Sequence, residues 1–92
     1  MSYRPKSHRD ENHAEIKEAF EKFGATMVDV SMVPNFVDLL GGYRGIDFQV
    51  EVKTPKGRVA KHQQDHADTW NGRRPVVVRT TVDVENVLKG MR

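Results

Sequence analysis

The segment from Ile46 to Lys53 carries acidic and basic side chains at a spacing that could support chemistry. Apolar and polar residues alternate along it, which predicts a β-strand with one buried face. Because strand side chains repeat every two residues, Glu51 and Lys53 project from the other, polar face. On an exposed sheet such a pair is commonly an ordinary ion pair. If a helix covers that face, the two charges are partly buried and need partners.

A second carboxylate, Asp38, lies in the otherwise apolar segment 36–40. An Asp in such a strand is costly to bury unless it caps a turn, is paired or binds a metal. The glycines within 41–45 predict a turn, and a hairpin there would bring Asp38 close to Glu51. Two neighbouring carboxylates repel each other, and a divalent cation removes that conflict. Hard oxygen ligands of this kind suit Mg²⁺ or Mn²⁺.

Gln63 is unusual because it lies among the apolar positions of a helix predicted over 59–71. Positions 60, 63, 67 and 70 form one helical stripe, so the Gln63 amide is expected to point toward the sheet. The other residues of this stripe are Ala60, Ala67 and Trp70. The amide could bond to the backbone, or it could be an active-site amide that reaches a phosphate or orients Lys53.

Two further sets of residues could contribute metal ligands. Glu15 flanks the buried stripe of a predicted first helix, where it could supply another oxygen or remain a solvated glutamate. His62 and His66 have the i, i+4 spacing of two zinc ligands on one helix. Their spacing places no third ligand, so a metal role for them has little support.

Hydrophobic periodicity predicts the elements that must position these side chains. We expect a helix from Asp10 or Asn12 to Phe23, strands over 26–33, 36–40 and 46–53, a helix over 59–71, a strand over 75–79 and a helix over 82–89. This α-β-β-β-α-β-α order predicts a single small α/β domain with a mixed sheet flanked by helices. Residues 1–9 are polar and contain Pro5, so we expect a flexible arm there and the domain over 10–92.

Length and composition exclude several classes of protein. A chain of 92 residues has room for one small domain, and the absence of cysteine excludes disulfides, thiolate zinc sites and cysteine nucleophiles. No apolar run approaches the roughly 20 residues of a membrane helix. The polar N-terminus does not resemble a signal peptide. We therefore expect a cytoplasmic protein with no membrane partner.

The net charge of +2 is too small to indicate nucleic acid by itself, but its distribution is uneven. The first predicted helix is acidic, whereas the stretch after Glu51 is basic up to residue 64. Such runs are usually solvated faces; the alternative is a phosphate-binding surface beside a carboxylate cluster. The candidate phosphate-binding residues are Lys56, Arg58, Lys61, Arg73 and Arg74.

These residues resemble those of a known family. The order of Asp38, a glycine-bearing turn and then Glu51-Val52-Lys53 resembles the PD-(D/E)XK nuclease signature. A longer match resembles the VRR-NUC branch of that superfamily, and it comprises PNFVDLLGGYRG (34–45), VEVKTPKGR (50–58) and Gln63. The similarity extends from Glu15 to the final helix. One departure is Val37, which stands where the family usually has proline.

The resemblance implies a restriction-endonuclease-like core and a metal-dependent phosphodiesterase. It implies that Mg²⁺ or Mn²⁺ is held by Asp38, Glu51 and the backbone carbonyl of Val52. Lys53 then positions or activates the attacking water and offsets phosphate charge. The family's helix glutamine matches Gln63, and its first-helix glutamate matches Glu15. Small stand-alone members, common in bacteriophage genomes, resemble Holliday-junction-resolving or structure-specific endonucleases and tend to be homodimers.

The sequence therefore predicts an endodeoxyribonuclease that acts on branched DNA. No recognition helix with groove-reading side chains is evident, which favours selection by DNA structure over selection by base sequence. A four-way junction has two-fold character, so a homodimer with two sites would suit it. One alternative is a non-catalytic nucleic-acid-binding module with a degenerate site. The other is a small regulatory or protein-interaction domain in which the charged cluster is structural.

Overall fold

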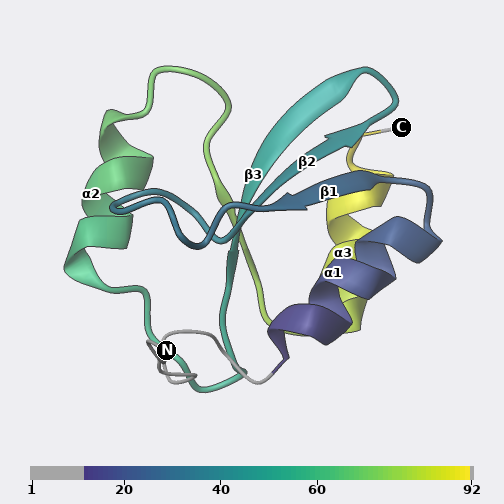
Figure 1. Ribbon diagram of the computed structural model, residues 1–92, viewed down its shortest axis with the longest axis horizontal. Helices are drawn as coiled ribbons and strands as arrows, with labels where there is room; N and C mark the ends of the chain where they lie inside the picture. Colours follow the sequence, from purple (N-terminus) through teal and green to yellow (C-terminus); the bar gives the residue numbers. More distant parts are fainter. Residues whose placement is uncertain (1–11, 92) are drawn as a thin grey trace.

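The computed structural model describes residues 12–91, which form three helices and four strands (Figure 1). In chain order these are α1 (His13–Lys22), β1 (Thr26–Asp29), β2 (Leu39–Tyr43), β3 (Ile46–Val52), α2 (Lys61–Thr69), β4 (Val76–Val78) and α3 (Thr81–Lys89). The order of helices and strands is the predicted one. The expected arm over 1–9 and the first residues of the predicted first helix lie outside the described residues. Within the described range, no helix has the length and hydrophobicity needed to cross a membrane.

The four strands form one mixed sheet in the order β1-β2-β3-β4. β2 is antiparallel to both of its neighbours, β1 and β3, whereas β4 runs parallel to β3. The chain reaches β4 through a crossover that contains α2, as a parallel pair requires. β3 is therefore a central strand, and its residues from Phe48 to Val52 are all buried.

The hydrophobic core lies on the face of the sheet that α1 and α3 cover, side by side (Figure 1). Alternate residues of β3, namely Phe48, Val50 and Val52, point into this core and meet Phe20 of α1 and Leu88 of α3. Each of these side chains is at most 2% exposed. The apolar face predicted for this strand is confirmed.

β1 and β2 differ from their predicted bounds. β1 ends at Asp29, whose Oδ1 accepts hydrogen bonds from the backbone N–H of Ser31 at 2.9 Å and from its hydroxyl at 2.6 Å. This Asx turn diverts the chain and ends the strand, so the prediction of a strand over 26–33 is too long. β2 covers Leu39–Tyr43 instead of 36–40. Asp38 therefore lies immediately before the strand.

The connection between β2 and β3 is shorter than the predicted turn over 41–45. Tyr43 pairs with Ile46, which leaves Arg44 and Gly45 as a two-residue loop. Their φ angles are +53° and +83°, as expected of a type I′ turn. Gly41 belongs to β2, and a Cβ there would lie 2.5 Å from Phe48 Cζ and 2.8 Å from Met27 Sδ. That glycine is thus required by close packing.

The helix α2 packs separately from α1 and α3 (Figure 1), and none of its residues is fully buried. Trp70 was expected on a buried stripe, but it is 44% exposed, so that part of the prediction is wrong. The helix ends at Thr69, and Trp70 adopts an extended conformation with φ −71° and ψ 123°. The side chain therefore leaves the stripe that a continued helix would have given it.

We predict that Gly41→Ala destabilises the fold by overpacking the core. Forcing a methyl group into a filled core costs about 1–3 kcal/mol, which corresponds to a fall of at least about 4 °C in the melting temperature of a domain of this size. The neighbouring Gly42→Ala is the matched control, because its Cβ would meet only Asp47 Oδ1, at an ordinary 3.6 Å. Equal melting temperatures for the two variants would contradict this account.

Candidate active site

The polar face of β3 is buried beneath α2. Gln49 and Glu51 are only 5% and 3% exposed. His66 Nε2 lies 2.8 Å from Gln49 Oε1, and Gln63 Nε2 donates a hydrogen bond of 3.1 Å to Glu51 Oε1. A helix therefore covers the Glu51 face, which was the condition for burying its charged side chains. It covers that face with polar groups, not with an apolar stripe.

Asp38 lies beside Glu51 at the open end of the β2–β3 hairpin. Leu39 pairs with Val50 in this antiparallel hairpin. Asp38, which precedes Leu39, therefore lies next to Glu51, which follows Val50. Two hydrogen bonds fix this position: the Asp38 N–H donates to Val50 O at 3.1 Å, and the Val52 N–H donates to Asp38 Oδ2 at 2.8 Å. The hairpin thus places Asp38 against β3 at the level of Glu51 and Val52, although the turn is tighter than expected.

Gln63 bonds to the backbone, as one of its two predicted alternatives had it, and it also bonds to Glu51, which the sequence did not predict. Its Oε1 accepts a hydrogen bond of 2.8 Å from the N–H of Ala60 at the start of α2, which satisfies one of the backbone donors there. Its Nε2 meanwhile donates to Glu51. Because both ends of the amide are used, the Gln63 side chain holds the Glu51 carboxylate in a defined orientation.

Lys53 follows the last residue of β3 and is half-buried. Its N–H donates to Val78 O at 3.0 Å, which continues the ladder with β4 by one residue. Strand alternation then directs the Lys53 side chain to the same face as Glu51. The carbonyl of Lys53 accepts a hydrogen bond of 3.1 Å from Asn12 Nδ2, which also donates to Arg79 O at 2.9 Å.

Asn12 and Arg79 were not found from the sequence, yet they fix the backbone around Lys53. Arg79 Nη1 donates to the carbonyls of Thr54 at 2.8 Å and Gly57 at 2.5 Å, so it holds the loop after β3. Asn12 precedes α1, and its side chain bridges two strand ends instead of capping its own helix. The only sequence signal was an Asn at a predicted helix start, which normally indicates a cap.

Glu15 is not brought into the site. It is exposed on α1, and residues 12–91 contain no group of three or more His, Asp or Glu side chains that could hold a metal ion. His66 contacts Gln49 and the ring of Phe36. The ligand set that the described structure offers is therefore the pair of carboxylates, together with nearby backbone carbonyls.

The five candidate phosphate-binding residues fall into two groups. Lys61 forms an ion pair with Asp65 at 2.9 Å, and Arg74 forms one with Asp68 at 2.9 Å. The hydrogen bond from Arg74, helped by one from Gln64, lowers the pKa of the Asp68 carboxyl below its usual range. The others are exposed without an acidic partner in the described range: Lys56, Arg58 and Arg73.

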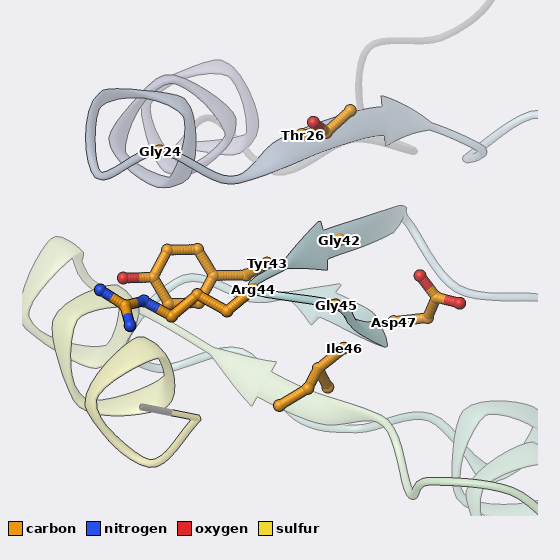
Figure 2. Close-up of a pocket in the computed structure, with 8 residues that line it drawn as sticks. All are labelled: Gly24, Thr26, Gly42, Tyr43, Arg44, Gly45, Ile46 and Asp47. Carbon is orange, nitrogen blue, oxygen red and sulfur yellow. The ribbon is translucent and has the colours of Figure 1, made fainter.

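A shallow pocket lies at the opposite end of the hairpin, around the turn between β2 and β3 (Figure 2). Figure 2 shows the side chains of Tyr43 and Arg44 extending together on one side, whereas the Asp47 carboxylate points away on the other. The pocket lining contains a single carboxylate, and neither Asp38 nor Glu51 contributes to it. The candidate active site therefore lies at the open end of the hairpin.

Comparison with known proteins supports the same architecture. No protein-family model and no curated protein matches the chain. A solved structure described as "VRR_NUC domain" does match, with a TM-score of 0.69 and 24% sequence identity over 86% of this chain and 91% of that chain. The expected resemblance is thus confirmed at the level of fold. The chain has the fold of a VRR_NUC domain.

Proposed function

We propose that this protein is a Mg²⁺- or Mn²⁺-dependent endodeoxyribonuclease that hydrolyses phosphodiester bonds in branched DNA, such as Holliday junctions. The observation that carries the proposal is the placement of Asp38 beside the buried Glu51 in a VRR-NUC fold. An isolated buried carboxylate is costly, and two adjacent ones are costlier still. A divalent cation between them would offset that cost.

These residues fit an ion such as Mg²⁺, which needs few protein ligands, better than a metal whose ligands all come from the protein. Mg²⁺ usually keeps several waters and binds through one or two carboxylates plus substrate phosphates. Asp38 uses Oδ2 to accept from Val52, which leaves Oδ1 for a cation, and Glu51 adds a second carboxylate. The backbone carbonyl of Val52, the residue between Glu51 and Lys53, is proposed as a further ligand.

Lys53 and Gln63 have distinct proposed roles. When bound, the metal would lower the pKa of a water and polarise the scissile phosphate. Lys53 would place a fixed positive charge where negative charge develops on the phosphate, and it would help position the attacking water. Gln63 orients Glu51 through its amide, as partners of ligating carboxylates commonly do.

The remaining basic residues would contact flanking phosphates. Lys56 and Arg58 belong to the loop after β3 and come three and five residues after Lys53. They are therefore placed to contact phosphates beside the scissile bond. Arg73 lies beyond α2. Such contacts supply affinity without base specificity, which agrees with selection by DNA structure.

We also propose that the active form is a homodimer. A symmetric pair of sites suits the two cuts that resolve a four-way junction. Val28 and Leu40 face each other across β1 and β2 and are 51% and 38% exposed. Exposed apolar side chains that are adjacent in this way are common at subunit interfaces.

Removing either carboxylate is expected to abolish cleavage. Asp38→Asn and Glu51→Gln keep the size of the side chain but remove the charge that a divalent ion requires. We expect each variant to cleave branched DNA at least about 100-fold more slowly in Mg²⁺ or Mn²⁺, since metal stabilisation of the transition state amounts to several kcal/mol. Asp47→Asn is the matched control, because Asp47 is an exposed acid of the same strand.

Three results of that assay would contradict the proposal. Cleavage that is unaffected by both substitutions would place catalysis elsewhere. Metal-independent DNA binding by the wild-type chain, with no product from branched, nicked or linear DNA, would identify a non-catalytic binding module. If the chain neither binds nor cleaves DNA, a structural role for the charged cluster in an interaction domain is the remaining explanation.

Gln63→Met tests the orientation of Glu51 separately. Methionine is close to glutamine in length but cannot donate to the carboxylate, so we expect activity to fall about 10- to 100-fold, the range typical of lost outer partners of metal ligands. Gln64→Met is the control, because Gln64 is exposed and its side-chain amide donates to Asp68 of its own helix. Equal activity of the two variants would show that the Gln63 amide is dispensable.

A further inference from the structure

Trp70 is held in a fixed position although it is 44% exposed. Its ring centroid lies 5.3 Å from that of His66 and 6.3 Å from that of Phe36, and Phe36 meets His66 edge-on at 5.4 Å. A Cβ at Gly72 would lie only 2.7 Å from Trp70 Nε1, so the backbone of Gly72 packs against the edge of the indole. These contacts order the ring and still leave part of it open to solvent.

The aromatic cluster of Phe36, His66 and Trp70 is connected to the candidate active site. His66 bonds to Gln49, which lies two residues before Glu51 on the same face of β3. Gln63, which bonds Glu51, is seven residues before Trp70. The cluster therefore adjoins the helix that holds Glu51 through Gln63.

The chemistry of this surface favours a nucleobase as its ligand. An exposed, ordered indole beside a proposed phosphate-binding site can stack on any base, since every base has a π-face. Arg73 is exposed three residues after Trp70 and supplies positive charge for the accompanying phosphate.

We propose that Trp70 stacks on an unpaired base of a DNA strand bound at the candidate active site. This inference rests on the proposed nuclease function. It assigns to Trp70 the role of selecting DNA that has unpaired bases. Bases inside a continuous duplex are already stacked on both faces, so only a base at a branch, flap or single-stranded end can present its face to the indole.

Intrinsic fluorescence tests the contact directly, because Trp70 is the single tryptophan of the chain. The full chain is titrated at low salt in EDTA, so that nothing is cleaved, with oligothymidylate or with an abasic oligomer of the same length. We expect the base-bearing strand to quench Trp70 emission and to bind about 5- to 150-fold more tightly, the range that corresponds to 1–3 kcal/mol per stacked base. The abasic strand should leave the emission nearly unchanged.

Substitutions separate stacking from folding. By fluorescence anisotropy of labelled DNA, Trp70→Ala should bind both strands with the abasic affinity, whereas Trp70→Phe should retain most of the preference. Phe23→Ala is the matched control, because Phe23 is an aromatic residue of similar exposure, 42%, at the far end of α1. It should bind both strands as the wild type does. The melting temperature of Trp70→Phe shows whether that variant folds.

Three results would overturn the inference. These are equal affinities for the base-bearing and abasic strands, an unchanged preference in Trp70→Ala, and an emission change that follows protein concentration but not DNA. The last would indicate that self-association covers the indole. The readout is independent of catalysis: stacking in EDTA survives even if no cleavage is ever found, and metal-dependent cleavage survives even if Trp70 proves irrelevant.

Discussion

The buried carboxylate of Glu51 is the constraint on which the rest of this structure depends. Removing a charge from water costs several kcal/mol after relaxation, and Glu51 is only 3% exposed. This cost is offset locally, because the polar helix α2 covers the polar face of β3 and bonds to its side chains. Gln63 bonds to Glu51, and His66 lies within hydrogen-bond distance of Gln49. Hydrogen bonds thus hold α2 against β3, whereas most helices are held against a sheet by apolar contacts.

The two faces of β3 thus have different roles. The core-facing residues of β3 pack with α1 and α3 and supply the stability of the domain, while the opposite residues carry the candidate chemistry. The two faces are linked just after the end of β3, where Asn12 binds the carbonyl of Lys53 and Arg79 binds the carbonyl of Thr54. A displacement of the core helix α1 would therefore be felt at Lys53, through Asn12.

The sequence predicted β3 well because its alternation is strict, and Asp38 and Glu51 followed from that strand and a hairpin. Other features had no local signal. The glycine at 41 looks like a turn residue in the sequence, and only the position of the Phe48 ring shows that it is required for packing. Asn12 and Arg79 are 67 residues apart, so no periodicity could relate them. Trp70 was misplaced because periodicity assumes that the helix continues, and it ends one residue earlier.

The central claim is that Asp38 and Glu51 share one divalent cation, and a direct Mn²⁺ titration tests it without any DNA. Isothermal titration of the full chain should show one Mn²⁺ site per chain that is lost in Asp38→Asn and in Glu51→Gln and retained in Asp47→Asn. The same ion should raise the melting temperature of the wild type by mass action. Mn²⁺ binding that persists unchanged in both carboxylate variants would contradict the account.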